Sequence, residues 1–225
     1  GRVTALRQAA DGGVLDASAD AVAAQRAIVS VPPPMTTSIT FEPPLPPERI
    51  TLQRNMFMGT VYKAVAVYET PFWRARGDAE CMLLGEPNVA VFDTSPPAGP
   101  GHLCMLVGGP QARALDDLDT DGRRAVLLRQ LAQHLGHAVE QPASWHEKAW
   151  HQDTFAGGGY SALPVQGTSE GFYPVASAPT GRIHWAGTET AAEHAGYIEG
   201  AIEAGIRAAR EVAKTIAHES QTKAH

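Results

Sequence analysis

The chain has 225 residues, a formal net charge of -6, 44% hydrophobic and 19% charged residues, so it can bury a substantial core in one large or two modest domains. No long run of Lys and Arg supports nucleic-acid binding, and no apolar run reaches the length of a membrane span. Residues 1–13 lack the apolar segment of a signal peptide. Cys81 and Cys104 fit neither a metal motif nor a disulfide framework, and we expect two buried thiols in a cytoplasmic protein.

The first quarter of the chain predicts short strands and a proline-rich crossing. Residues 1–8 and 13–17 are two expected strands around Asp11-Gly12, a hairpin signal. Residues 27–31 are an apolar run stopped by prolines, which predicts a well-buried strand. The prolines of residues 38–55 exclude a continuous helix or a central strand, so this stretch is interpreted as a crossing between two lobes.

The middle of the chain predicts a sheet with one helix. In "GTVYKAVAVYETPFW" the alternation places Lys63 on one side of a strand with three valines. The stretches "ECMLLG", "NVAVFDTS" and "HLCMLVGG" predict three more strands. Residues 119–135 predict a helix with a leucine stripe, a cap at Asp119 or Thr120 and a stop at Gly136. Residues 145–167 are rich in aromatics and glycine and show little periodicity.

The last part of the chain predicts a strand at 182–186, a turn at 187–190 and a helix from 196 to 217. An apolar stripe follows this helix at Ile198, Ile202 and Ile206 and continues beyond them. A helix start offers free N–H groups to an electron-rich ligand, and Gly196 and Gly200 leave room for a ligand or a neighbouring backbone. Two interpretations stay open here: one edge of a nucleotide or flavin pocket, or a tight contact of helix on sheet.

The stretch "AGTETAAEHAGYIEGAIEAGIRAA" resembles the C-terminal flavin-binding segment of the flavin-containing amine oxidases, the monoamine and polyamine oxidase family. "AIVSVPPPMTTSITFEPPLPPER", "GTVYKAVAVYETPFWR" and "KAWHQDTFAGGGY" are similar to other segments of that family in the same order. The resemblance implies an α/β fold with two lobes. Residues 1–35 and 149–225 are expected in an FAD-binding lobe, and residues 36–148 in a substrate lobe of mixed sheet with a helix.

The resemblance also implies roles for four side chains. Lys63 matches the lysine that holds a water near flavin N5, and Trp150 matches a tryptophan beside the flavin. Tyr160 and Tyr197 match the two tyrosines of the aromatic cage, whose ring faces favour the substrate amine. Without the resemblance, Lys63 would be interpreted as an edge-strand lysine that reaches solvent. For Trp150, an ordinary core aromatic stays open as the alternative.

Backbone contacts to the cofactor are implied at three further places. Gly187, Thr188 and Glu189 match the turn that touches FAD. The helix start at Gly196, Tyr197 and Ile198 matches the part that bonds the pyrimidine edge of the flavin. Val3 matches a position whose backbone meets the adenine.

Two departures from the family pattern carry expectations of their own. The animal monoamine oxidases have a flavin-bound cysteine where this chain has Gly159, so we expect FAD to be held non-covalently. The family's N-terminal Gly-x-Gly-x-x-Gly motif does not occur in this sequence. We therefore expect only the C-terminal half of the fold here, with the dinucleotide-binding part supplied by another segment or a separate chain, and weak or no FAD binding by this chain alone.

The resulting hypothesis is FAD-dependent oxidation of a small primary or secondary amine, with O2 reduced to H2O2. An L-amino-acid oxidase or monooxygenase of the same superfamily stays open, and would need Arg54, Arg74 or Arg76 for the substrate carboxylate. A non-catalytic partner chain and a homo-oligomer also stay open. The histidines fit no metal-ligand spacing, and no Gly-x-Ser-x-Gly elbow suggests a hydrolase.

Overall fold

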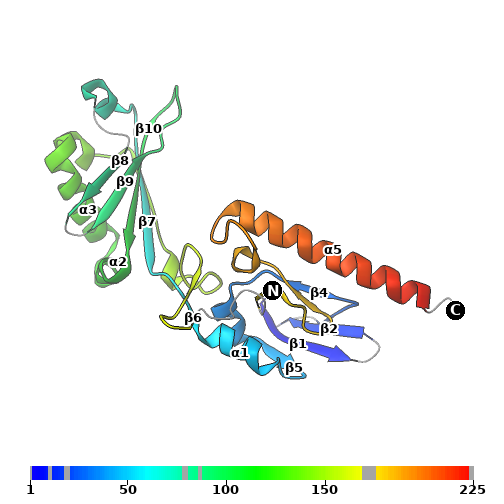
Figure 1. Ribbon diagram of the computed structural model, residues 1–225. Helices are drawn as coiled ribbons and strands as arrows, with labels where there is room; N and C mark the ends of the chain where they lie inside the picture. Colours follow the sequence, from blue (N-terminus) through cyan, green and yellow to red (C-terminus); the bar gives the residue numbers. More distant parts are fainter. Residues whose placement is uncertain are drawn as a thin grey trace. The chain divides into compact units, whose positions relative to one another are not determined.

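The computed structural model describes residues 2–9, 12–17, 21–77, 81–85, 88–168 and 176–222. The chain divides into two units that both mix strands and helices: unit 1 comprises Gly1–Met58 and Tyr160–His225, and unit 2 comprises Gly59–Gly159 (Figure 1). Residues 36–58, expected in the substrate lobe, pack in unit 1, where Leu45 and Ile50 join the core around Leu6 and Trp185. Residues 149–159, expected in the FAD-binding lobe, pack in unit 2.

Unit 2 is an antiparallel five-stranded sheet with helices against it. The strand order is β11-β7-β10-β9-β8. The strands are β7 (Val61–Tyr68), β8 (Cys81–Leu84), β9 (Val89–Asp93), β10 (Gly101–Gly108) and β11 (Ser144–Ala149), and the helices are α2 (Gly109–Ala114) and α3 (Thr120–Leu135). Four short 3-10 turns complete it: η2 (Phe72–Arg76), η3 (Leu115–Asp117), η4 (His137–Glu140) and η5 (Trp150–Gln152). The four strands predicted for this part of the chain are confirmed, and β11 is an addition.

The alternation of β7 separates a core face from a more open one. Tyr62, Ala64, Ala66 and Tyr68 are buried in the main core, which also takes the leucine stripe of α3. The predicted cap is confirmed, because the Asp119 carboxylate accepts the Gly122 N–H at 2.7 Å. The opposite face of β7 carries Lys63 and the three valines.

In the described residues, unit 1 is built from small sheets, helices and short 3-10 turns. The sheets have the orders β3-β2-β1-β5, β12-β6 and β13-β4. The strands are β1 (Val3–Ala9), β2 (Gly12–Ala17), β3 (Ala21–Ala24), β4 (Ala27–Val29), β5 (Thr40–Glu42), β6 (Met56–Met58), β12 (Ala162–Pro164) and β13 (Ile183–Trp185). The remaining elements are α1 (Pro47–Arg54), α5 (Ile198–Thr222), η1 (Pro33–Ser38) and η6 (Thr188–Thr190). Within the described ranges, every helix is too short or too polar to cross a lipid bilayer.

The strands in the first quarter of the chain agree only in part with those expected from the sequence. The antiparallel pair of β1 and β2 is confirmed, while Asp11 lies outside the described residues. The well-buried strand expected over residues 27–31 is wrong in length and burial: β4 has three residues, and Ile28 is 45% exposed. The reason is that β4 pairs in parallel with β13 in a sheet of only these two strands, which leaves part of its surface uncovered.

The helix α5 turns a small and polar face toward its own unit. Its fully buried positions are Gly200, Ala204 and Ala208. The predicted apolar stripe lies on the other side: Ile198, Ile202 and Ile206, which we call the isoleucine stripe, are 76%, 56% and 47% exposed. The stripe therefore adds little to the core of unit 1.

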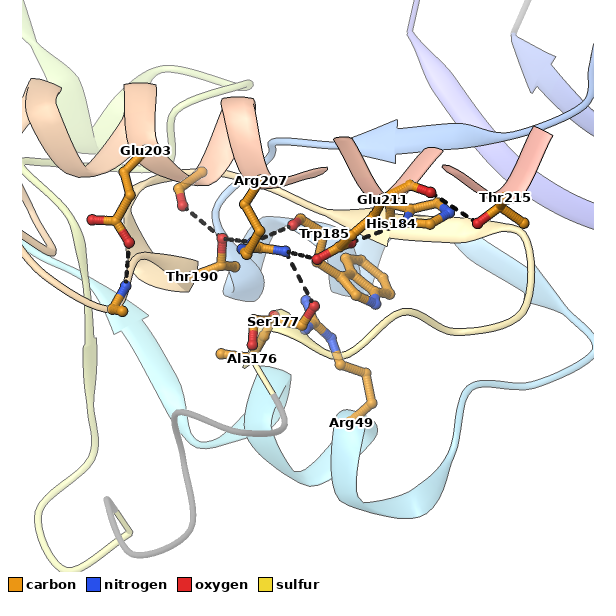
Figure 2. Close-up of polar contacts among 12 residues, drawn as sticks. Arg49, Ala176, Ser177, His184, Trp185, Thr190, Glu203, Arg207, Glu211 and Thr215 are labelled. Carbon is orange, nitrogen blue, oxygen red and sulfur yellow. Dashed lines mark hydrogen bonds and ion pairs between the residues drawn. The ribbon is translucent and has the colours of Figure 1, made fainter. Parts of the chain in front are cut away.

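Charged side chains fasten the inward face of α5 to β13 and η6 (Figure 2). Arg207 donates to Trp185 O at 2.8 Å, to Thr190 Oγ1 at 2.9 Å and to Glu211 at 2.8 Å. Glu211 also bonds His184 Nδ1 at 3.1 Å. Burial acts to raise the pKa of Glu211, but the hydrogen bonds from His184 and Arg207 outweigh it and lower that pKa. These contacts explain why the charged row, and not the isoleucines, faces inward.

Two glycines of α5 should respond to alanine in opposite directions. A Cβ on Gly200 would lie 2.2 Å from His194 O, whereas a Cβ on Gly205 would meet nothing within 4 Å. We expect Gly200→Ala to lower the free energy of unfolding by about 1–3 kcal/mol because the first turn must shift. Gly205→Ala should raise it by about 0.5–1 kcal/mol, as in an open helix interior.

Urea unfolding followed by circular dichroism at 222 nm measures both changes. Stabilisation by both substitutions would contradict the close contact between His194 and the first turn of α5.

Candidate functional site

The turn η6 lies at the centre of the residues that the sequence assigned to cofactor contact in unit 1. Gly187 leads into it from β13 with φ of 92°, and a Cβ there would lie 3.1 Å from Ser30 O. Glycine is therefore required both by conformation and by space. Thr188 and Glu189 follow, the first half-buried and the second buried.

Thr188 bonds the segment that carries Tyr197. Its hydroxyl accepts the Gly196 N–H at 2.6 Å and donates to Tyr197 O at 2.9 Å. Gly196 has φ of 90°, a conformation that side chains rarely adopt. One hydroxyl thus closes the turn just before α5.

Glu189 bonds the segment that carries Tyr160. Its carboxylate accepts the Ala162 N–H at 2.8 Å, two residues after that tyrosine. A Cβ on Gly196 would lie 3.4 Å from Ser161 Oγ, so the segments of the two tyrosines are neighbours. Both tyrosine side chains are 70% exposed.

The start of α5 offers hydrogen-bond donors beside these tyrosines. Tyr197 N–H donates to His194 O, and Tyr197 O accepts from Ala201 N–H, so the helix begins at this residue. The N–H groups of the first helical turn have no carbonyl partner within a helix. Such donors fit the pyrimidine edge of a flavin, whose carbonyl oxygens and N1 accept hydrogen bonds.

Two other predicted positions in unit 1 have different surroundings. Val3 lies in β1 and packs against the core cluster of Leu6 and Trp185. Gly200 was expected to make room for a ligand or a neighbouring backbone, and the structure shows that the backbone of His194 fills that room.

The two remaining predicted residues lie in unit 2. Lys63 is on β7, which pairs with β11 on one side and β10 on the other, so the edge-strand interpretation of this lysine is wrong. It is half-buried and lies near the buried Cys104 thiol. Trp150 begins η5, is 39% exposed, and has Lys148 Nζ 5.5 Å from its ring centroid, so it is not a fully buried core aromatic.

A polar network in unit 2 was not anticipated from the sequence. Glu147 accepts hydrogen bonds from Tyr62 at 2.6 Å, from Trp145 at 2.8 Å and from Arg123. Burial and the contact with Glu147 raise the pKa of Tyr62. The residues come from β7, α3 and β11, and a spacing along one segment could not have revealed their meeting.

Polar contacts made by His151 also fix the position of η5. The ring of His151 bonds Asp116 at 2.9 Å and Val61 O at 3.2 Å, which ties Trp150 to the beginning of β7. A cavity of about 320 Å³ lies beside these groups, and its lining includes Tyr62, Asp116, Arg123 and Glu147. In the described part of the chain, no three His, Cys, Asp or Glu residues are grouped to hold a metal ion.

The two cysteines should differ in reactivity. Cys81 is exposed, which corrects the expectation of two buried thiols, because it begins β8 at the sheet edge. Burial raises the pKa of Cys104, and the nearby Lys63 ammonium partly offsets that rise. In a Cys81→Ser background we expect slow alkylation of Cys104, and Lys63→Met should raise its pKa further.

The rate of iodoacetamide reaction against pH measures this pKa. Lys148→Met is the matched control, since Lys148 lies opposite Lys63 on β11 and bonds Asp153. An unchanged or lowered Cys104 pKa in Lys63→Met would contradict the contact.

Comparison with known proteins places this chain in a family. Residues 1–213 match the family described as flavin containing amine oxidoreductase. A Mycobacterium tuberculosis protein named as a flavin-containing monoamine oxidase, AofH, is 42% identical over 188 residues, covering 83% of this chain and 41% of that protein. The L-amino acid dehydrogenase of Synechocystis is 36% identical, with 83% and 40% covered.

A solved structure agrees with these relatives. Cyclohexylamine oxidase from Brevibacterium oxydans superposes with a TM-score of 0.89 at 28% identity, covering 95% of this chain and 48% of that one. The chain thus spans less than half the length of these proteins. Together, the matched residues and the shared fold show that the chain belongs to the flavin-containing amine oxidoreductase family.

Proposed function

We propose that this chain is the C-terminal part of an enzyme that oxidises a small primary or secondary amine with FAD and O2. The observation that carries the proposal is the presence of two exposed tyrosines on neighbouring segments beside a helix start. Tyr160 and Tyr197 project from neighbouring segments, and the donors of the first turn of α5 lie next to them. An aromatic pair beside a flavin edge suits an amine substrate.

Under this proposal each predicted side chain has one task. Tyr160 and Tyr197 hold the amine between their rings, and Lys63 holds a water at the reacting edge of the cofactor. Trp150 packs beside the cofactor. The support for Lys63 is its place on an interior strand, half-buried with a thiol nearby, where an ammonium group needs a polar neighbour.

FAD fits the donors that unit 1 presents. The first turn of α5 would bond its pyrimidine edge, Gly187, Thr188 and Glu189 would touch it as a turn, and Val3 would meet the adenine. The chemistry that bound FAD would supply is the two-electron oxidation of the amine to an imine, with O2 reduced to H2O2; water would then hydrolyse the imine to an aldehyde and release ammonia or an amine. Gly159 offers no thiol for a covalent bond, so the cofactor is held non-covalently.

The same proposal includes two lobes and a further segment. Unit 1 serves as part of the FAD-binding lobe, and unit 2 serves as the substrate lobe. The segment with the dinucleotide-binding motif covers the isoleucine stripe of α5 and extends the two-stranded parallel sheet of β4 and β13. Three observations support it: the exposure of the stripe, the small size of that sheet, and a span of 41% of AofH.

An L-amino-acid oxidoreductase is the second candidate, favoured by the relative named L-amino acid dehydrogenase. It needs an arginine for the substrate carboxylate. Arg74 is engaged with Asp93 at 2.6 Å and Ser95 O at 3.1 Å, and Arg54 is exposed. These positions favour a simple amine. A non-catalytic partner chain is the remaining alternative.

Cofactor binding tests the assembly. We expect native mass spectrometry and absorption spectra to show tight FAD binding only when the chain is combined with a segment that carries the glycine motif. Acid precipitation of the complex should release the yellow colour into the supernatant. Flavin that stays with the precipitate would contradict non-covalent binding, and tight one-to-one binding by the chain alone would contradict the need for the segment.

A matched pair of variants tests the covered face. Ile202→Glu should weaken the complex at least about tenfold, because a carboxylate would be buried at the interface. His218→Glu, which changes an exposed residue near the end of the same helix, should leave it intact. Equal affinity of the two variants for the segment would exclude the isoleucine stripe from the interface.

Turnover of benzylamine against its α-carboxylated analogue, phenylglycine, separates the two enzyme classes. We expect the loaded complex to favour benzylamine. Tyr197→Ala should lower kcat/KM about tenfold or more, while Tyr197→Phe, which keeps the ring, should lose much less. A preference for phenylglycine would favour the amino-acid oxidoreductase, and no turnover of either would favour the non-catalytic partner.

A further inference from the structure

We infer that Thr188 and Glu189 are positioning residues that set the spacing of Tyr160 and Tyr197. The inference rests on the proposed function for its catalytic meaning, but its geometric content stands on unit 1 alone. The two side chains are consecutive in η6, and each bonds the backbone of a different tyrosine-bearing segment.

Thr188 controls the Tyr197 side. A threonine hydroxyl can accept and donate at once, and here it does both, across the Gly196–Tyr197 peptide. The acceptance fixes Gly196 in its unusual conformation, and the donation fixes the carbonyl of Tyr197 itself. The hydroxyl also lies 3.0 Å from the Cβ position of Gly200, so it packs against the first turn of α5.

Glu189 controls the Tyr160 side. Its carboxylate is buried and accepts the Ala162 N–H at the first residue of β12. A charged acceptor makes a stronger hydrogen bond than a neutral one, and burial increases its effect. Since Tyr160 precedes this anchor by only two residues, its backbone has little freedom relative to η6.

The turn η6 is itself held on the other side. Thr190 Oγ1 donates to Gly187 O at 2.9 Å and accepts from Arg207 at 2.9 Å (Figure 2). The backbone positions of the two tyrosines are therefore both held by one rigid turn, η6, which is itself bonded to α5. A slot between two rings tolerates displacements of only a fraction of an ångström, so such a common frame is what an aromatic pair requires.

Fluorine NMR of the chain labelled with 3-fluorotyrosine tests the inference without any cofactor. Signals are assigned with Tyr→Phe variants, and Tyr62 and Tyr68 in unit 2 serve as internal references. We expect Thr188→Val to shift or broaden the Tyr197 signal and Glu189→Met to do the same to Tyr160, each with little effect on the other tyrosine. Thr188→Ser and Glu189→Gln, which keep the bonding oxygen, should restore the native signals.

Should Thr188→Val fail to fold, Thr188→Ala against Thr188→Ser gives the same comparison, since both lack the methyl group and differ in the hydroxyl. Unchanged tyrosine signals in folded Val and Met variants would overturn the inference, as would identical effects of both variants on both tyrosines. Selective effects that the Ser and Gln variants reverse support it.

Steady-state kinetics of the FAD-loaded complex test the catalytic part of the inference. We expect Thr188→Val and Glu189→Met each to lower kcat/KM for benzylamine by about tenfold or more, with rescue by Ser and Gln. Selective NMR effects with no wild-type turnover would uphold the positioning and reject the proposed function. Turnover by the wild-type complex together with unchanged NMR signals in the variants would uphold the proposed function and reject the positioning.

Discussion

The hydroxyl of Thr188 is the contact on which the arrangement of unit 1 depends. It closes the turn between β13 and α5 by accepting from one residue and donating to the next. Without it, the left-handed conformation of Gly196 would lose its main local support, and the start of α5 would lose its fixed relation to the turn. The neighbouring Glu189 extends the same frame to β12.

The helix α5 shows how one element can serve two surfaces. Small residues let it approach β13 closely, and Arg207 and Glu211 satisfy polar groups that this approach buries. Its isoleucines remain on the opposite side, where unit 1 provides no equivalent packing. An exposed row of isoleucines on a helix whose small and polar face is already packed is typical of a surface that meets a further part of a larger protein. This agrees with a chain that spans less than half of its relatives.

The sequence predicted the elements whose patterns are strong. Alternation identified β7, and the leucine repeat with Asp119 and Gly136 identified α3 almost to the residue. The stretch containing β11 gave no clear signal, because its half-buried edge position permits charged and aromatic side chains together. Likewise α1 was missed, since its prolines stand at the helix start, where they are tolerated, and not inside it.

The site divides in the same way. The resemblance to a family supplied the predicted site residues, and in the structure those of unit 1 other than Val3 lie in or near the turn η6. The side chains that organise them could not be read from the sequence, because the bonds from Thr188 to Tyr197 and from Glu189 to Ala162 join positions 9 and 27 residues apart. The isoleucine periodicity of α5 was predicted from the sequence, but nothing in the periodicity says which face meets unit 1.

Hydrogen exchange at the Gly196 amide tests the central contact most directly. We expect slow exchange of this amide in the native chain, faster exchange in Thr188→Val, and near-native protection in Thr188→Ser. Fast exchange in the native chain, or protection that persists when the hydroxyl is removed, would contradict that contact.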